Sequence, residues 1–269
     1  MTLQLVDIGV NLSNKAFDKD RDDVVSRAIE QGVTTMILTG TSLEESQQVL
    51  DLARRYPGHC FCTAGVHPHG AKDTNTQTFK ALKSLFNEPE VVAVGETGLD
   101  FNRDFSPRPA QEKVFENQLE LAIECGLPLF CHERDASERF SEIIKNYRDQ
   151  ISKLVVHCFT ADKTALYRYL DLDCHIGITG WICDERRGTH LHPLMKDVPE
   201  NRLMVETDAP WLLPRTLKTK PKDRRNEPAF LSEVINMIAN NTGKTPERIA
   251  QETWRTSLVF FNLECPFPP

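Results

Sequence analysis

The feature that most constrains the fold of this chain is a regular alternation of short apolar segments with longer amphipathic ones. The short segments are rich in β-branched residues and have the length of buried strands. The longer segments carry apolar residues at helical spacing, as in 18–31 and 108–125. Eight such strand–helix units in 269 residues predict a (β/α)8 TIM barrel of the α/β class. The predicted strands cover residues 3–8, 33–38, 60–66, 91–95, 127–131, 153–157, 174–179 and 202–206.

A doubly wound sheet is the alternative architecture. That fold calls for a glycine-rich phosphate turn after the first strand, whereas Gly9 to Asn14 read G-V-N-L-S-N. No repeat or low-complexity linker divides the chain, so we expect one domain over residues 1–263 and a disordered tail over 264–269. Further helices are predicted over 43–55, 77–87, 135–148, 162–171, 228–241 and 246–260, with a short one near 189–197.

Composition excludes several classes of protein. No run of 18 apolar residues occurs, and the first residues lack the basic and apolar regions of a signal peptide. The eight cysteines include no C-x-x-C pair, which argues against a disulfide scaffold and a zinc ribbon and favours a reducing, cytoplasmic setting. A net charge of −7 argues against nucleic-acid binding driven by a broad positive field, although a metal ion and a local basic loop can supply positive charge.

Ionisable residues stand at the ends of the predicted strands, which is where barrel enzymes place their working residues. Glu96, His132, His157 and Asp208 follow four of these strands. Two imidazoles and two carboxylates suit a divalent cation such as Zn²⁺, Mn²⁺ or, with more water ligands, Mg²⁺. We therefore predict these four residues as metal ligands, with Asp208 and Glu96 as the catalytic pair and Asp208 as the general base.

Two further groups are predicted to bind substrate. His67 and His69 flank Pro68, which indicates a turn in which His67 lines the site and His69 only bonds locally. The segment 215–225 is strongly basic in an acidic chain, and loops after the last barrel strands often bind phosphate. The predicted substrate-binding residues are His67, Arg186, Arg187, Arg224 and Arg225, whose cations position a phosphate backbone without reading its sequence.

Six ordered motifs make the chain resemble the TatD-type metal-dependent deoxyribonucleases of the amidohydrolase-like barrels. The resemblance implies a 3′-to-5′ exonuclease acting on DNA, mainly single-stranded, with RNA as a further substrate and Mg²⁺ as the usual activating ion. It implies a cytoplasmic protein with a role in DNA repair or degradation, and metal binding by Glu96, His132 and His157 with Asp208 beside them. We expect a monomer without membrane partners. The motifs are Gly65–His69, Gly95–Asp100, His132–Asp135, His157–Thr160, Glu206–Pro210 and Arg225–Pro228.

The chain departs from that pattern at its first strand. Most relatives carry D-x-H-x-H there, which supplies two imidazoles to a second metal ion, whereas this chain has Asp7, Gly9 and Asn11 at those positions. We therefore expect one firm metal site and any second ion to be weak or to arrive with the substrate. Two alternatives stay open at this point: a metal-dependent hydrolase of a small amide, ester or lactone on the same barrel, and a barrel that binds nucleic acid without catalysis.

Overall fold

The computed structural model describes residues 4–264 and contains eight strands. All eight start within two residues of the predicted positions. The exception in length is β4, which continues five residues past its expected end and so carries Glu96 inside the strand rather than after it. The strands are β1 (Leu5–Val10), β2 (Val33–Leu38), β3 (Cys60–Ala64), β4 (Val91–Asp100), β5 (Leu129–Arg134), β6 (Leu154–Val156), β7 (His175–Ile178) and β8 (Leu203–Val205).

These strands form one parallel sheet in sequence order, from β1 to β8. A bridge between Val10 and Ala209 joins the two edges, so the sheet closes into a barrel. The (β/α)8 prediction is therefore confirmed.

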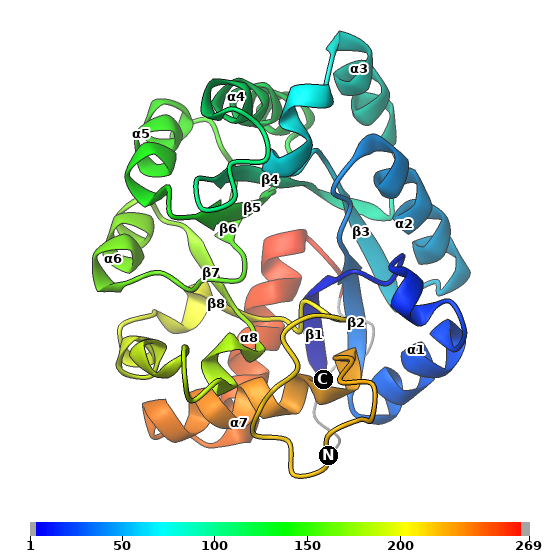
Figure 1. The fold of residues 1–269 in the computed structure, drawn as a ribbon, viewed down its shortest axis with the longest axis vertical. Coiled ribbons are helices and arrows are strands. Elements are labelled where there is room, and N and C mark those ends of the chain that lie inside the picture. The colour runs from blue at the N-terminus through cyan, green and yellow to red at the C-terminus, as the bar shows by residue number, and fades with distance from the viewer. Residues whose placement is uncertain (1–3, 265–269) are drawn as a thin grey trace.

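Helices surround the sheet, as Figure 1 shows for the ring that runs from α1 to α6. Where helices were expected the structure has them, except near 189–197, where two short 3₁₀ helices, Thr189–Leu191 and Pro193–Lys196, replace one α-helix. Pro193 cannot donate a backbone hydrogen bond, which prevents one continuous α-helix there. The α-helices are α1 (Arg21–Glu30), α2 (Leu43–Arg55), α3 (Thr76–Leu85), α4 (Arg108–Cys125), α5 (Ser137–Tyr147), α6 (Lys163–Asp171), α7 (Leu231–Thr242) and α8 (Pro246–Phe261).

The core has two parts because both faces of a barrel strand are covered. All six residues of β1 are buried. One face of the strands packs inside the barrel, where Ile8, Phe130 and Met204 belong to one apolar cluster. The other face packs against the helices, where Leu38, Phe115 and Leu166 belong to a second and larger cluster. This double packing fixes the strand ends rigidly in space.

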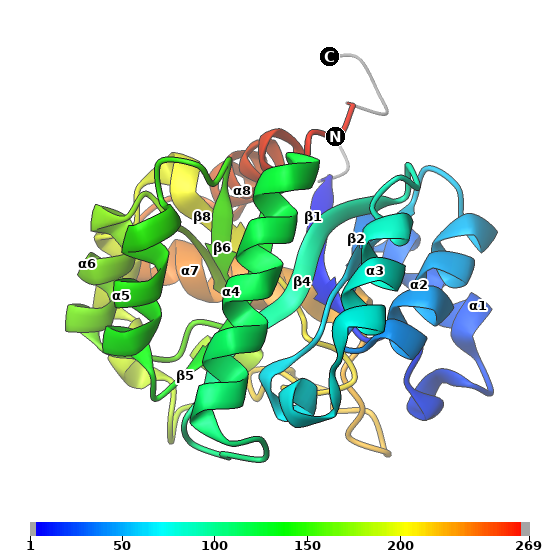
Figure 2. The ribbon, with the colours of Figure 1, turned by 90° about the horizontal axis from the view of Figure 1, so that it is seen from above.

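The loops that follow the strands gather on one side of the barrel. Figure 2 shows the loops after β3, β4 and β8 on its lower edge. Among residues 4–264, no helix is both long and apolar enough to span a membrane. The expected disordered tail lies, apart from Glu264, outside the described residues.

Candidate functional site

The candidate site lies at the carboxyl ends of the strands and centres on the buried carboxylate of Glu96. Its Oε1 atom lies 2.7 Å from His157 Nε2, 3.1 Å from His132 Nδ1 and 3.3 Å from His67 Nε2. The structure thus brings three of the four predicted metal ligands together and adds His67. Ligand atoms of His67, Glu96 and His132 all lie within 4.8 Å of one another, as donors around one ion would.

The register between β4 and β5 explains how His132 reaches this centre. His132 pairs with Gly98, which stands between Glu96 and Asp100 on β4, and alternate residues of a strand share a face. The ring of His132 therefore meets both carboxylates, Glu96 through Nδ1 and Asp100 through Nε2, the latter at 3.2 Å. Only glycine fits at position 98, because a Cβ there would lie 1.9 Å from the carbonyl oxygen of His132 and φ is +132°.

A carboxylate also stands behind His157. Its Nδ1 atom faces Glu206 Oε2 at 3.4 Å, and both atoms are buried without another hydrogen-bond partner. Histidines that ligate metals usually direct their second ring nitrogen to a carboxylate, which fixes the ring and raises its basicity. His132 with Asp100 and His157 with Glu206 both show this arrangement. The donor set of Glu96, His132 and His157 therefore fits a divalent cation.

The electrostatics of the centre favour positive charge. Burial alone would raise the pKa of Glu96, but the nearby His157 and His67 outweigh it and hold that pKa well below its usual value. Burial would lower the pKa of His157, but Glu96 and Glu206 outweigh it and hold that pKa well above its usual value. A metal ion at this position would satisfy the same carboxylates.

His67 is oriented as a hydrogen-bond donor toward Glu96, although its ring also belongs to the group of ligand atoms within 4.8 Å of one another. Its Nδ1 atom accepts a hydrogen bond from the backbone N–H of His69 at 3.1 Å, and burial lowers its pKa. A neutral ring whose Nδ1 accepts carries its proton on Nε2, the atom that faces Glu96. This arrangement suits the predicted contact of His67 with substrate.

His69 differs from the sequence-based expectation of a purely local hydrogen bond. Its Nε2 atom lies 2.7 Å from Asp100 Oδ2, so it shares that carboxylate with His132. The 3₁₀ helix Pro68–Asp73, which starts immediately after His67, turns His69 back toward β4. The turn predicted from Pro68 was right, but its consequence for His69 was wrong.

Asp208 lies on the β8 side of the site. Its Oδ1 atom accepts a hydrogen bond from Asn11 Nδ2 at 2.9 Å. Burial raises the pKa of Asp208 to about 7, with the charges of Glu96 and Glu206 adding to the effect and that of His157 opposing it. The carboxyl group therefore titrates near neutral pH, where a general base is most effective.

Gly9 leaves room for Glu206. A Cβ at position 9 would lie 2.4 Å from Glu206 Oε2, so no side chain fits there while that carboxylate keeps its place. The carboxylate of Glu206 thus occupies the space into which a histidine at position 9 would project. A side chain at position 9 and the carboxylate of Glu206 in its observed position are therefore mutually exclusive.

The predicted substrate-binding arginines fall into two groups. Arg186 and Arg187 both donate to Asp184 yet keep side-chain exposures of 59% and 53%, and Arg224 is exposed. Arg225 lies differently from the expectation, because its terminal nitrogens bond to Asp20, Glu227 and the backbone carbonyl of residue 16, and its side chain is 13% exposed. Its hydrogen-bonding groups anchor the loop to the protein instead of facing solvent.

Sequence reasoning gave no role to Asp100 or Glu206, although both stood in the motifs quoted for the family. Asp100 could have been found by extending the alternation of β4, since it lies four residues after Glu96 and therefore on the same face. Glu206 carried no such signal. Its role depends on the space at Gly9 and on its contact with His157. These three residues lie in β1, after β6 and after β8, so their proximity appears only in the folded barrel.

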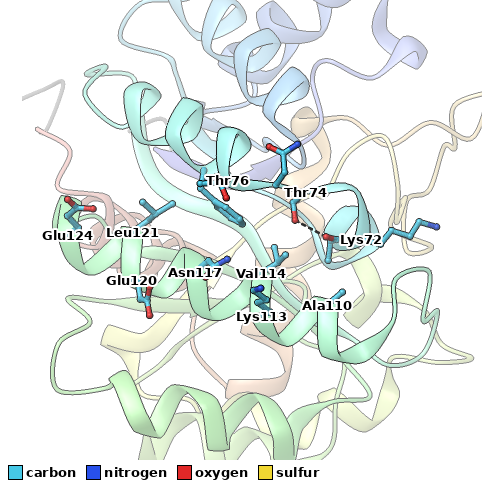
Figure 3. Close-up of a pocket in the computed structure, with 13 residues that line it drawn as sticks. Lys72, Thr74, Thr76, Ala110, Lys113, Val114, Asn117, Glu120, Leu121 and Glu124 are labelled. Carbon is cyan, nitrogen blue, oxygen red and sulfur yellow. Dashed lines mark hydrogen bonds between the residues drawn. The ribbon is translucent and has the colours of Figure 1, made fainter.

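A groove of about 610 Å³ lies between the 3₁₀ helix Pro68–Asp73, α3 and α4, and the residues that line it do not include those of the candidate site. Figure 3 shows Lys72 and Lys113 toward one end of this groove and Glu120 and Glu124 toward the other. Because the charge changes sign along α4, the groove as a whole does not suit a polyanion. The loops around the strand ends, which carry the exposed arginines, suit substrate phosphates better.

Known proteins resemble this chain over nearly its whole length. The family described as TatD related DNase matches residues 6–262. Proteins named 3′-5′ ssDNA/RNA exonuclease TatD from Salmonella typhimurium and Erwinia tasmaniensis are each 48% identical over 259 residues, which is 96% of this chain and 99% and 100% of theirs. The crystal structure of a TatD homologue from Escherichia coli superposes with a TM-score of 0.88 at 25% identity, covering 98% of this chain and 100% of that one. The chain therefore belongs to the family of TatD-related DNases.

Proposed function

We propose that this protein is a metal-dependent 3′-to-5′ exonuclease that hydrolyses phosphodiester bonds of mainly single-stranded DNA, and of RNA, with a role in DNA repair or degradation. The observation that carries the proposal is the centre at Glu96, where imidazole nitrogens surround one carboxylate oxygen. The second ring nitrogens of His132 and His157 face Asp100 and Glu206, respectively. Relatives at 48% identity bear the name of such an exonuclease. The basic loop after β8 favours a phosphodiester over the alternative amide, ester or lactone substrate.

We assign the divalent cation to Glu96, His132 and His157, with Asp208 beside them, and take Mg²⁺ as the ion in function, with Zn²⁺ or Mn²⁺ able to occupy the same donors. When bound, such an ion polarises a phosphoryl oxygen and lowers the pKa of a neighbouring water. Asp208, held by Asn11 and with a pKa of about 7, receives the proton of the attacking water. His67 donates its Nε2–H to a phosphate oxygen, and Arg186, Arg187 and Arg224 hold the strand through its phosphates.

We further propose a cytoplasmic monomer with a single domain over residues 1–263. All seven cysteines within residues 4–264 are free, as expected in a reducing compartment. Size-exclusion chromatography with light scattering checks the monomer.

The test is digestion of single-stranded oligonucleotides labelled at the 3′ or the 5′ end, with Mg²⁺, with Mn²⁺ and with EDTA. The variant to compare is the His132→Ala/His157→Ala double mutant, and His190→Ala, which removes an exposed imidazole, is the control. We expect metal-dependent release of the 3′ label as a mononucleotide, lost in the double mutant and kept in the control. Absence of cleavage with either metal ion would refute the nuclease assignment and redirect the protein to an ester and lactone screen.

A further inference from the structure

Two exposed aromatic side chains stand on opposite sides of the candidate site. Within residues 4–264, four large hydrophobic side chains are exposed, and two of them, Phe105 at 56% and Trp211 at 57%, lie on loops that follow barrel strands. Phe105 comes after β4 and Trp211 after β8. In a closed barrel whose eight strands follow sequence order, β4 and β8 are four strands apart in both directions and therefore face each other across the barrel.

Phe105 is tied to the histidine side of the site. Its ring centroid lies 4.7 Å from that of His69, and the hydroxyl of the next residue, Ser106, donates to the backbone carbonyl of His69 at 2.8 Å. Because His69 shares Asp100 with His132, the position of Phe105 is fixed relative to the metal-binding centre.

Trp211 is tied to the Asp208 side in the same manner. Its backbone N–H donates to the carbonyl oxygen of Asp208 at 2.9 Å, within a tight turn that follows β8. More than half of the indole remains exposed although tryptophan is costly to leave in water. The side chain therefore contributes little to the core while standing one turn from the predicted general base.

We propose that Phe105 and Trp211 are stacking platforms for two unpaired bases, one on each side of the phosphodiester at the site. The inference rests on the proposed exonuclease function and deepens it. Every nucleobase has an aromatic face, so stacking contributes about 1–3 kcal/mol per base without reading sequence. Bases in a duplex are already stacked and paired, so two such platforms select single strands.

The surroundings favour a nucleobase over a protein partner. Protein interfaces need a contiguous apolar patch, whereas these two aromatics are separate and have an ionisable centre between them. The neighbouring rim residue Trp181 is already covered, with the guanidinium groups of Arg187 and Arg134 at 4.3 Å and 5.4 Å from its ring. Phe105 and Trp211 are more exposed than Trp181, so their rings are open to a base, while Arg186 and Arg187 lie on the loop after β7 where they can meet its phosphates.

The experiment compares Phe105→Ala and Trp211→Ala with the wild type on two single-stranded oligonucleotides, one ordinary and one with abasic sites at its last two 3′ positions. Tyr167→Ala, which removes a 43%-exposed aromatic on α6, is the matched control, and Trp211→Phe tests rescue by another ring. The readouts are kcat/KM with Mg²⁺ and the Kd in EDTA, measured by fluorescence anisotropy. The second readout needs no turnover.

We expect each alanine variant to lose about 5- to 150-fold in affinity and in kcat/KM on the ordinary strand, the range that corresponds to stacking of one base. On the abasic strand, the kcat/KM and Kd of the variants should agree with those of the wild type within about twofold. On the ordinary strand, Trp211→Phe should recover most of the loss and Tyr167→Ala should match the wild type. Equal losses on both strands would show that the rings only position their loops, and no loss on either strand would show that they do not contact bases.

The two proposals fail separately in this design. The wild type could cleave neither strand but bind the ordinary strand more tightly than the abasic strand in EDTA, with the variants losing that preference. This result would support the stacking platforms and refute the exonuclease assignment. If the wild type cleaves the ordinary strand and the variants show no base-dependent loss, the assignment stands and the platforms fall. If the wild type neither cleaves nor binds the ordinary strand, both fall.

Discussion

The carboxyl groups on the two sides of the candidate site have pKa values shifted in opposite directions. On the β4–β5 side, the carboxylates of Glu96 and Asp100 are faced by imidazoles, and these contacts outweigh burial and hold the pKa of each carboxyl group below its usual value. On the β1–β8 side, burial dominates and raises the pKa of Asp7 to about 8 and that of Asp208 to about 7. One side is therefore poised to bind a cation, and the other to hold or accept a proton.

The difference traces back to the residues of β1. The residues at the end of β1 that face the site are Gly9 and Asn11, so this strand contributes no imidazole, and Asn11 donates a hydrogen bond to Asp208. Glu206 lies between the two sides. One of its carboxylate oxygens faces Nδ1 of His157 and also occupies the space beside Gly9. The comparison teaches that a side of the site without imidazoles can hold its carboxyl groups protonated near neutral pH, because burial rather than a counter-charge sets their pKa.

The first test of this contrast between the two sides is the substitution Asp208→Asn. If Asp208 acts as the general base, its removal lowers kcat by about 10²–10⁴-fold. If the cation is held chiefly by Glu96, His132 and His157, as proposed, calorimetric titration of Asp208→Asn with Mg²⁺ or Mn²⁺ should give an affinity close to that of the wild type, whereas Glu96→Gln should lose it. An Asp208→Asn protein that loses the ion together with its activity would make Asp208 primarily a ligand and would remove the division between the two sides.

The second test concerns Glu206, where the two sides meet. Glu206→Gln preserves the shape of the side chain but removes the carboxylate behind His157, so metal affinity should fall by about 10–100-fold. Asp100→Asn should act similarly through His132, and Glu44→Gln, on the exposed surface of α2, is the control for loss of one negative charge. Unchanged affinity in Glu206→Gln would mean that its carboxylate does not support the ligand.

The fold was predictable from the sequence because strand and helix periodicities alternate over almost the whole chain. Boundaries set by local signals were also predictable, as at Gly126, which ends α4 with φ of +70°. The length of β4 was not, since Gly98, beyond the predicted end at residue 95, does not look like a strand residue. The strand continues because the register to β5 shifts between residues 94 and 97 and Gly98 then pairs with His132.

The site was predictable only as a set of residue types at strand ends. That reasoning found Glu96, His132 and His157, because each ionisable side chain directly follows an apolar run. It did not find the partners of these residues, since the contact of His132 with Asp100 depends on strand register and that of His157 with Glu206 depends on the space at Gly9. Both are properties of the assembled barrel.

A third test uses pH, through Asp7. Burial raises the pKa of Asp7 to about 8, although hydrogen bonds from Thr207 and the backbone N–H of Gly9 oppose the shift. The folded protein then holds a proton that the unfolded chain releases near pH 4. The stability that this proton contributes is present below about pH 4 and is lost as pH rises to about 8, by at most about 1.4 kcal/mol per pH unit.

The measurement is urea unfolding in EDTA between pH 5 and pH 8. We expect the stability of Asp7→Asn to depend less on pH than that of the wild type, because an amide does not titrate in this range. Asp51→Asn, at an exposed position on α2, should keep the dependence of the wild type. The same slope in all three proteins would place the proton elsewhere and weaken the contrast between the two sides.

The smallest effects are expected in the basic loop that follows β8. There, Arg225 should affect stability and its neighbour Arg224 should affect substrate binding. Arg225 bonds to Asp20 and Glu227 and its guanidinium lies 4.9 Å from the ring centroid of Phe17, so Arg225→Ala should lower the free energy of unfolding by about 1–3 kcal/mol. Arg224 is exposed, so Arg224→Ala should leave stability unchanged within about 0.5 kcal/mol. If Arg224 contacts one phosphate, its loss should also reduce the dependence of log Kd on log salt by about 0.7 for a single strand. The reverse pattern, with the salt dependence reduced in Arg225→Ala and kept in Arg224→Ala, would show that Arg225 exchanges its carboxylate partners for substrate phosphate, as the sequence alone predicted.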